Sequence, residues 1–261
     1  MGREAETGYN LGMHDSVKSA LPRLLSANLL KGLPEPVARD FLSVLNVVRL
    51  PARGVVFRAG DPGDRVFIVI SGKVKVTRPS DDGKDNVFTI AGPGDLLGEL
   101  SMFDGAARLA TATAMRPTDV GWVANAATRE WLERHPEASR RFMLMLIDRI
   151  RRQNDALEDV YGLDVGTRVA RAIVRLSGRF GRITQDGIRV DLGMSQEELA
   201  LHVRASRESV NQVFSVFSRN QWIRREGSDL TILDAPALAK RTRYSGSVLP
   251  IRDAGESSPE V

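Results

Sequence analysis

The chain has 261 residues and a mass of 28.7 kDa, with 42% apolar and 27% charged residues. These proportions fit one or two globular domains with a real core and exclude a disordered or fibrous protein. Because the chain has no Cys, a disulfide framework, a thiolate-held iron–sulfur cluster and a thiol nucleophile are excluded as well. The three His residues, His14, His135 and His202, lie far apart in the sequence, which is not the pattern of a multi-His metal or haem site.

The charge balance is modest but its composition is unusual. Lys and Arg number 37 against 33 Asp and Glu, so the formal net charge is only +4. Six of these cations are Lys and 31 are Arg, the cation suited to forked recognition of phosphate and guanine. A GC-rich genome would produce the same excess of Arg, so both explanations stay open. With no apolar stretch of about 18 residues and no secretion signal, we expect a cytoplasmic protein that makes no membrane contact.

The first third of the chain predicts a tail, two helices and then many strands. Residues 1–15 are polar and are expected to form a flexible tail. Apolar residues at helical spacing in residues 17–33 and 37–45 predict two short helices. Residues 47–123 change to short β-rich runs separated by turn clusters at intervals of about ten residues, which predicts a sandwich or barrel. The predicted strands are residues 55–57, 66–70, 74–77, 87–90, 109–113 and 120–123.

A long helix is predicted from Pro136 to Gly162. An apolar seam with spacings of 4, 4, 3, 4 and 3 runs along it, formed by Phe142, Leu146, Ile150, Gln153, Leu157 and Val160. This spacing is typical of a coiled coil, and a polar residue such as Gln153 is common in dimer seams. The alternative is a helix that packs only on its own domain.

The last third of the chain predicts a small helical domain with hairpins. Helical patterns occupy residues 165–176, 196–203 and 206–217, and hairpin patterns occupy residues 183–190 and 223–232. We therefore expect five segments: a tail at 1–15, helices and a β-rich domain at 16–135, a long helix at 136–162 that could pair with a second copy, a helix-and-hairpin domain at 163–235, and a C-terminal tail at 236–261.

The segment from Ser195 to Phe214 has the form of a helix-turn-helix. Ser195 and Glu198 are spaced as a capping box, and Ser206 is placed to cap the second helix. Apolar residues give each helix one buried stripe, which leaves four residues outward on the second helix: Arg207, Glu208, Asn211 and Gln212.

These outward side chains are chemically able to read DNA. A recognition helix enters the major groove with its first residues facing the base edges, where Arg pairs with guanine, Glu with cytosine, and Asn or Gln with adenine. The hairpin that follows has a basic first strand at residues 222–225, suited to flank a phosphate backbone. Residues 165–226 hold 11 Arg and 6 acidic residues, a local net charge of +5. The alternative is an ordinary polar helix surface.

A glycine loop in the β-rich region is a second candidate site. Residues 92–98 are followed by Glu99, Leu100 and a short predicted helix, whose exposed N–H groups could hold a phosphate. Arg108, expected on the next strand, could supply a positive charge, and Glu99 could accept from a ribose hydroxyl. From these residues alone, a structural corner of the β-roll is the favoured interpretation.

These motifs together resemble the cyclic AMP receptor protein superfamily of bacterial transcription regulators, which includes the catabolite activator and fumarate-nitrate regulators. The resemblance covers residues 25–240. It rests on Ser206-Arg207-Glu208-Ser209-Val210 in the recognition helix and on Gly98-Glu99-Leu100 followed by Arg108. Asn211 and Trp222-Ile223-Arg224 are most similar to the actinobacterial branch.

The resemblance implies an α+β fold: an N-terminal cyclic-nucleotide-binding β-roll, similar to a jelly roll, then a long dimerisation helix and a C-terminal winged helix-turn-helix. It implies a homodimeric, allosterically controlled DNA-binding regulator of transcription that is not an enzyme. Its expected partners are double-stranded DNA with palindromic TGTGA-like half-sites, a second copy of itself, and RNA polymerase as a further candidate. The implied DNA-binding residues are Ser195, Gln196, Ser206, Arg207, Glu208, Asn211 and Gln212.

The resemblance also implies an effector pocket. Its expected residues are Gly98, Glu99, Leu100, Arg108, Leu109, Gln153 and Asn154, with the last two contacting adenine across the dimer. No cofactor is obligatory, no metal is expected, and cyclic AMP or another cyclic (di)nucleotide, including cyclic di-GMP, is the expected effector. Members that bind cyclic AMP carry Ser or Thr where this chain has Leu109. The loss of that hydrogen bond corresponds to about 1.5–3 kcal/mol.

Two departures lie in the helix-turn-helix: Arg204 replaces the usual turn Gly, which implies either a different turn geometry or a tolerated positive φ, and Gln212 replaces a common basic residue. Two alternative functions stay open. One is a nucleotide-binding module without a DNA role, and the other is a DNA-binding regulator that needs no effector.

Overall fold

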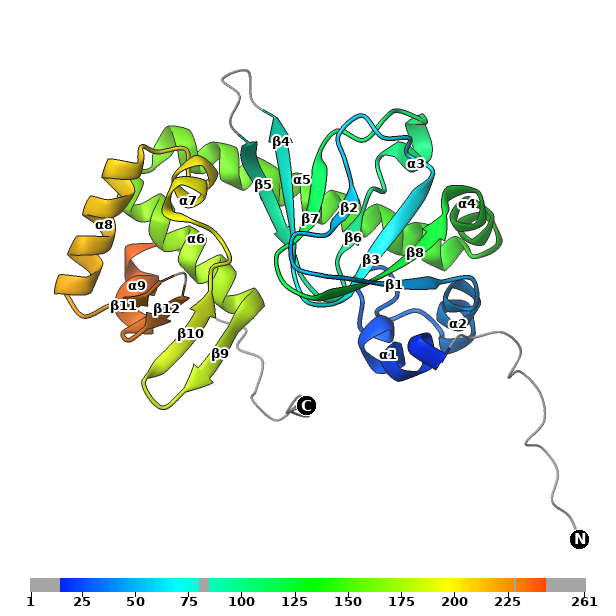
Figure 1. Ribbon diagram of the computed structural model, residues 1–261, viewed down its shortest axis with the longest axis horizontal. Helices are drawn as coiled ribbons and strands as arrows, with labels where there is room; N and C mark the ends of the chain where they lie inside the picture. Colours follow the sequence, from blue (N-terminus) through cyan, green and yellow to red (C-terminus); the bar gives the residue numbers. More distant parts are fainter. Residues whose placement is uncertain (1–14, 80–84, 228, 243–261) are drawn as a thin grey trace, which may run out of the picture. The chain divides into compact units, whose positions relative to one another are not determined.

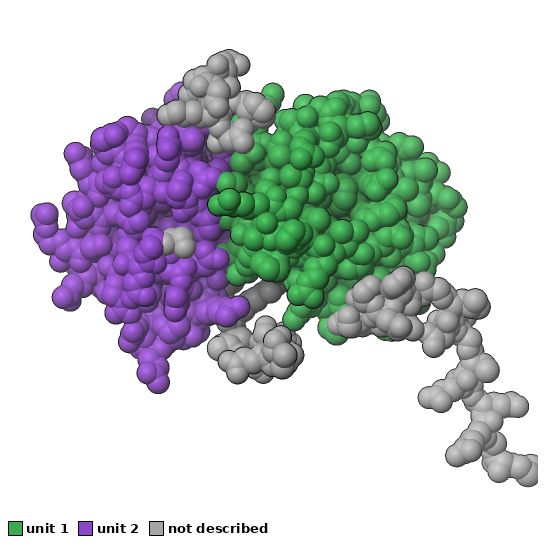
Figure 2. All heavy atoms as spheres, in the orientation of Figure 1, with its two compact units in different colours: residues 1–78, 89–149 green, residues 79–88, 150–261 purple. Residues whose placement is uncertain are grey.

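The computed structural model describes residues 15–79, 85–227 and 229–242. Two compact units are formed: unit 1 comprises residues 1–78 and 89–149, and unit 2 comprises residues 79–88 and 150–261 (Figure 2). The elements of each can be followed in Figure 1. Within the described ranges no helix is long and apolar enough to cross a membrane, and no group of three His, Asp or Glu side chains could hold a metal ion.

Unit 1 begins with two helices, α1 (Asp15–Leu25) and α2 (Glu35–Ser43), as the apolar spacing predicts. Pro34 caps α2 and Pro36 lies in its first turn, where a missing N–H costs nothing. Their apolar faces pack on α4 (Asn125–Arg134), where the indole of Trp131 donates a 3.0 Å hydrogen bond to the carbonyl of Val37. Phe41 lies 4.7 Å from the Trp131 ring. This cluster fixes the helices to the β-rich region that follows.

The β-rich region forms two antiparallel four-stranded sheets, with strand orders β1-β8-β3-β6 and β2-β7-β4-β5. Buried apolar side chains from both sheets make one core, including Phe67 and Val120 from the first and Phe57, Val76 and Ala112 from the second. The strands are β1 (Asn46–Leu50), β2 (Val55–Phe57), β3 (Arg65–Ser71), β4 (Val74–Pro79), β5 (Asp85–Ala91), β6 (Leu96–Leu97), β7 (Thr111–Ala114) and β8 (Thr118–Ala124). The predicted two-sheet architecture is confirmed.

Helix α5 (Pro136–Gly162) is continuous over 27 residues, as predicted. The predicted seam is wrong in its N-terminal part. Phe142 is buried in the unit 1 core, and Leu146 packs against the same core. Because that face of α5 is already used, the exposed apolar residues of this part fall one position later, at Met143 and Ile147. Ile150 and Leu157 of the predicted seam are exposed, and Tyr161 continues the exposed stripe. Asn154 lies four residues after Ile150 and three before Leu157, on the same face of the helix. Asn154, and not Gln153, is therefore the polar residue of the exposed stripe.

Unit 2 contains the end of α5 and a winged helix-turn-helix, as predicted. Strands β11, β12, β10 and β9 form one antiparallel sheet in that order, against which helices α6 and α8 pack. Val169, Ile173, Val210, Phe214 and Leu230 are among its buried residues. The elements are α6 (Val165–Phe180), β9 (Gly181–Thr184), β10 (Gly187–Asp191), α7 (Gln196–His202), α8 (Arg207–Arg219), β11 (Ile223–Glu226), β12 (Asp229–Ile232) and α9 (Ala235–Arg241).

The predicted start of the C-terminal tail at residue 236 is wrong, because residues 235–241 form α9. Asp234 caps this helix, Pro236 lies in its first turn, and Leu238 is fully buried. The helix is only seven residues long, so its two apolar turns did not stand out in the sequence. The predicted tails at residues 1–14 and 243–261 lie outside the described residues.

The connection from α5 to α6 is held by ion pairs within unit 2. Asp159 on α5, which is buried, pairs with Arg171 and Arg175 on α6. Asp164 caps α6 and also pairs with Arg241 of α9 at 2.5 Å. Although partial burial opposes the shift, hydrogen bonds from Arg241 and Thr167 lower the pKa of Asp164 to about 2. These contacts join the end of α5 to helices α6 and α9 of unit 2.

Candidate functional site

The glycine loop of unit 1 bends into β6 and then into the short helix α3 (Ser101–Asp104). Gly98 has a φ of +76°, and a Cβ atom there would lie 2.4 Å from Nη1 of Arg108. Only glycine therefore satisfies both the backbone and the space at this position. The structure brings Gly98 and Arg108 together, as the sequence predicts.

Arg108 lies in the loop before β7, not on a strand as predicted. The side chain is 4% exposed, and its Nη1 and Nη2 donate to the carbonyls of Gly98 at 2.6 Å and Arg65 at 2.5 Å. The guanidinium also lies over the Phe57 ring, 4.7 Å from its centroid. Its Nε is buried without a hydrogen-bond partner. The side chain is thus held by neutral carbonyls and an aromatic face.

The charge of Arg108 is only indirectly balanced. Among the described residues no carboxylate lies within ion-pair distance of it. Burial lowers the pKa of the Arg108 guanidinium, and the more distant carboxylates of Asp64, Glu99 and Asp61 oppose that shift. Arg stays protonated at any physiological pH. A buried cation without a direct counter-ion, with an unsatisfied N–H, favours an anionic ligand.

Glu99 is 2% exposed and forms an ion pair with Arg149 on α5. The sequence predicted Glu99 as a ribose acceptor, and it missed Arg149. No local signal marks Arg149, because it lies 50 residues from Glu99 and is one of many Arg residues on α5. In this ion pair Arg149 engages Oε1 of Glu99. The pair therefore links the nucleotide-binding cassette, by which we mean residues 92–100 and Arg108, to α5 within unit 1.

The position after Arg108 carries an apolar side chain. Leu109 is 57% exposed and cannot donate a hydrogen bond. Thr111, two residues later, already uses its hydroxyl oxygen to accept from the backbone N–H of Ala59 at 3.1 Å. Leu100, also predicted in the pocket, is exposed. The cassette therefore contains the predicted cation and glycine but no hydroxyl donor beside the cation.

Gln153 and Asn154 are exposed on the part of α5 that belongs to unit 2. Arg108 and Glu99 belong to unit 1. The predicted contact of Gln153 and Asn154 with an adenine base stays a prediction.

The helix-turn-helix of unit 2 is capped as predicted. Ser195 and Glu198 form a reciprocal capping box at the start of α7, and the Ser206 hydroxyl accepts from the N–H of Ser209 at the start of α8. Arg204, in the turn between the helices, has a φ of +51°. The predicted positive φ at this position is thus observed with a non-glycine residue.

The first turn of α8 presents its polar side chains outward. Ser206, Arg207, Glu208 and Gln212 are exposed, while Asn211 is half-buried. The pKa of Glu208 is lowered by hydrogen bonds from its own backbone N–H and from the Ser206 hydroxyl, so its carboxylate is charged at neutral pH. The turn therefore offers one cation, one anion and several neutral polar groups.

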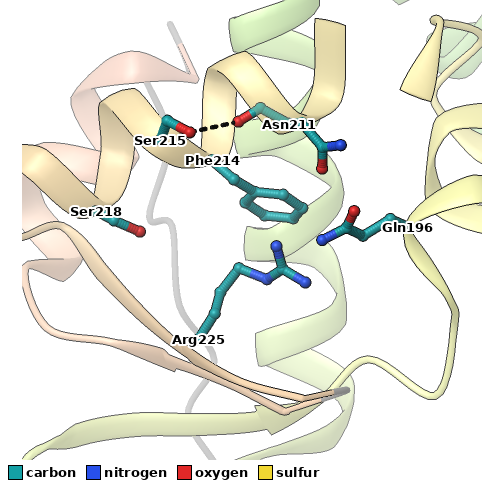
Figure 3. A pocket seen from close by; sticks show the side chains of 6 residues that line it. All are labelled: Gln196, Asn211, Phe214, Ser215, Ser218 and Arg225. Carbon is teal, nitrogen blue, oxygen red and sulfur yellow. Dashed lines mark hydrogen bonds between the residues drawn. The ribbon is translucent and has the colours of Figure 1, made fainter. Parts of the chain in front are cut away.

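A cleft of about 460 Å³ lies beside this face, between the start of α7, α8 and strand β11 (Figure 3). Arg225 of β11 extends into it, with its guanidinium 4.5 Å from the centroid of the Phe214 ring (Figure 3). The Gln196 amide lies between Arg225 and Asn211, within hydrogen-bond distance of both. The sequence predicted Gln196 and Asn211 as DNA-binding residues but treated Arg225 only as part of a basic strand. The residues that line the cleft are Gln196, Asn211, Phe214, Ser215, Ser218 and Arg225.

Both sites match known domain families. Residues 47–135 match the cyclic nucleotide-binding domain, and residues 167–241 match the Crp-like helix-turn-helix domain. The chain is 40% identical over 222 residues to the CRP-like cAMP-activated global transcriptional regulator of Mycobacterium tuberculosis, covering 84% of this chain and 98% of that protein. It is 24% identical over 203 residues to the cAMP-activated global transcriptional regulator CRP of Haemophilus influenzae, covering 77% of this chain and 90% of that protein.

Solved structures have the same fold. The c-di-GMP responsive global regulator CLP of Xanthomonas campestris is 22% identical, with a TM-score of 0.65 over 76% of this chain and 99% of that one. FixK2 of Bradyrhizobium japonicum is 17% identical, with a TM-score of 0.68 over 78% of this chain and 100% of that one. The chain therefore belongs to the family of Crp-like transcription regulators, DNA-binding proteins that carry a cyclic nucleotide-binding domain and are not enzymes.

Proposed function

We propose that this regulator reads TGTGA-like half-sites through the first turn of α8. The observation that carries the proposal is the exposure of Arg207 and Glu208 directly after the Ser206 cap. Arg207 can donate in a fork to O6 and N7 of guanine, and Glu208 can accept from N4 of cytosine. Gln212 and Ser195 lie on the same domain and could make further contacts to DNA. RNA polymerase is the proposed protein partner of the DNA-bound regulator.

The proposal includes a homodimer. Met143, Ile147, Ile150, Leu157 and Tyr161 leave an apolar stripe exposed along α5, with Asn154 in the same register. Spacings of three, four and seven residues suit a left-handed helix pair, and a buried Asn fixes its register. A two-fold dimer would place two α8 helices about 34 Å apart, one turn of DNA.

The proposed effector is a cyclic nucleotide, with cyclic AMP as the first candidate. Arg108 supports this choice, because its buried guanidinium has only carbonyl partners and an unsatisfied Nε. A cyclic phosphate would replace these neutral acceptors by a charged one, and such hydrogen bonds are about twice as strong. Gln153 and Asn154 would hold the base from α5. The curated relatives carry cyclic AMP activation in their names.

A second candidate function is a regulator that responds to another cyclic (di)nucleotide, or to no effector. Leu109 favours it, because this exposed apolar side chain supplies no hydroxyl to a phosphate. The choice between these candidates is made by direct titration. Calorimetry of the full chain against cyclic AMP, cyclic GMP and cyclic di-GMP separates them: binding of cyclic AMP alone supports the first, and a failure of cyclic AMP to bind supports the second.

DNA binding is tested by fluorescence anisotropy with a duplex that carries inverted TGTGA half-sites and with a scrambled duplex. Arg207→Ala should weaken binding of the specific duplex by about 1–3 kcal/mol and leave the scrambled duplex nearly unchanged. Arg219→Ala is the matched control, since it removes an exposed Arg from the last turn of the same helix. Affinity for both duplexes should fall steeply as salt is raised. Equal losses for the two variants would contradict readout by the first turn.

The dimer is tested by sedimentation of Ile150→Asp, which should shift the protein to a monomer because a charge would be buried in the α5 seam. Ile183→Asp, at a similarly exposed position on β9, should not change the mass. A wild-type protein that sediments as a monomer would contradict this part of the proposal.

A further inference from the structure

The cleft beside α8 contains a chain of three hydrogen-bonding side chains, from Arg225 on β11 through Gln196 on α7 to Asn211 on α8 (Figure 3). The side-chain amide of Gln196 has two polar atoms, an oxygen and a nitrogen. One of the two faces the Arg225 guanidinium, and the other faces the side-chain oxygen of Asn211. The three side chains come from three different elements, so their order depends on the folded domain.

The polarity of this chain is fixed by Arg225. A guanidinium can only donate hydrogen bonds, so the Gln196 atom that faces it must be the oxygen. In this orientation, rotated by 180° from the one drawn in Figure 3, the Gln196 oxygen accepts from Nη1 at 2.5 Å and Nη2 at 2.7 Å. The Gln196 nitrogen then donates to Oδ1 of Asn211 at 2.6 Å. The opposite orientation would set acceptor against acceptor and donor against donor.

Arg225 is held in place independently of Gln196. Its guanidinium lies 4.5 Å from the centroid of the Phe214 ring, which is 3% exposed and belongs to the domain core. Arg and aromatic faces attract each other by a cation–π interaction. Arg225 therefore acts as a fixed donor at one end of the chain, and Gln196 transmits this polarity to Asn211.

The consequence concerns how Asn211 can read DNA. Pairing with adenine in the major groove requires an Asn that accepts from N6 with its oxygen and donates to N7 with its nitrogen. In this structure the Asn211 oxygen is already an acceptor for Gln196, whereas its Nδ2 donates to no described side chain or backbone group. An amide oxygen keeps a second lone pair, but the hydrogen bond from Gln196 sets the direction of the Asn211 oxygen. The groups left unengaged are the Nδ2 hydrogens, which suit bases that present acceptors, such as N7 and O6 of guanine or O4 of thymine.

We propose that Gln196 and Arg225 are positioning residues that set base specificity: by occupying Oδ1 of Asn211 they direct this residue to acceptor edges, guanine or thymine, in place of adenine. This inference rests on the proposed DNA-binding function. It assigns Arg225 a role that differs from phosphate contact, because its effect is felt at one base pair and not along the whole duplex.

The test is selection of binding sites from a duplex library with randomised half-sites, followed by sequencing. Asn211→Ala first identifies the base pair that Asn211 reads, as the position where the preference of the wild type disappears. At that position the wild type should select guanine or thymine. Arg225→Glu places an acceptor at the end of the chain, which turns the Gln196 amide and frees the Asn211 oxygen, so adenine should gain about tenfold over guanine.

Two variants control for charge and for packing. Arg224→Glu makes the same charge change on the neighbouring, exposed residue of β11, and it should weaken binding overall without changing the base preference. Arg225→Lys keeps a donor-only group and should retain the wild-type preference even if affinity falls. Because each readout is a ratio between bases for one variant, a general loss of affinity does not affect it.

The outcomes separate this inference from the proposed function. If the wild type selects no sequence, the proposed function fails and the inference fails with it. If the wild type selects a defined half-site but Arg225→Glu and Arg224→Glu show the same base preference as the wild type, the proposed function stands and the inference is overturned. A change in preference confined to Arg225→Glu supports it.

Discussion

The carboxylate of Glu99 and the guanidinium of Arg149 form an ion pair that is almost closed to water on the carboxylate side. Glu99 is 2% exposed, whereas the Arg149 side chain is 27% exposed. The pair joins the nucleotide-binding cassette to α5, the helix that carries the exposed apolar stripe. Any ligand that engages Glu99 must therefore also affect the position of an α5 side chain.

Removal of Arg149 should destabilise unit 1. Arg149→Ala leaves a buried carboxylate without its partner. Such a change lowers the free energy of unfolding by about 3–5 kcal/mol for a fully buried pair, and by about 2–3 kcal/mol when water reaches one partner. Arg39→Ala is the control, because Arg39 pairs with Glu35 on the surface and such pairs contribute less than about 1 kcal/mol. Urea denaturation followed by tryptophan fluorescence measures both. Equal urea midpoints for Arg149→Ala and Arg39→Ala would contradict a larger stabilising contribution from the Glu99–Arg149 pair.

Gly98 should be far less tolerant of substitution than Gly105. Both have a positive φ, +76° and +65°, so Ala at either position carries the backbone strain of the left-handed region, about 1–2 kcal/mol. At Gly98 a Cβ atom would also displace Arg108, whereas at Gly105 nothing lies within 4 Å. Thermal melting should therefore show a larger loss for Gly98→Ala. Nucleotide binding, measured by calorimetry, should be lost only in that variant.

Leu109 should limit affinity for cyclic AMP. Leu109→Ser introduces a hydroxyl beside Arg108 at an exposed position, so the fold should be unaffected. One added hydrogen bond to a charged phosphate corresponds to about 1.5–3 kcal/mol, a gain of about one to two decades in affinity. Leu109→Val is the matched control, since it shortens the side chain without a donor. Calorimetric titration that gives the same affinity for both variants would argue against a phosphate beside residue 109.

The stability of unit 2 should fall as the pH drops below neutral because of His202. Burial lowers the pKa of His202 from 6.5, the nearby charge of Arg175 acts in the same direction, and a weaker opposing effect comes from the Val87 carbonyl at 3.4 Å. The unfolded chain then binds a proton more readily than the folded one. The stabilising contribution is therefore complete above about pH 6.5 and declines as the pH falls from there towards the lowered pKa.

This pH effect is measured by thermal melting at pH 7.5 and pH 5.5. Each unit of pKa depression is worth about 1.4 kcal/mol, so the wild type should melt at a lower temperature at the acid pH. His202→Gln keeps a polar side chain that does not titrate, and it should reduce the difference between the two pH values. An unchanged difference in this variant would assign the effect to other groups.

The sequence by itself determined the elements whose signals are local. The capping box of Ser195 and Glu198 and the Ser206 cap each depend on residues within a few positions, so their spacing could be read directly. The alternation of β-rich runs and turns likewise predicted a sandwich or barrel, and the helical spacing predicted α5. The motif of Arg207 and Glu208 was evident for the same reason.

Only the tertiary structure decided which partners the charged side chains have. Arg149 meets Glu99, Arg108 turns to the carbonyls of Gly98 and Arg65, and Arg225 enters the cleft of Gln196. In a chain with 31 Arg residues, composition gives no means of choosing among them. The N-terminal part of the exposed stripe of α5 also moved by one residue, to Met143 and Ile147, because the core of unit 1 had already covered Phe142. Such contacts join residues far apart in the sequence, and their geometry exists only after the sheets and helices have packed.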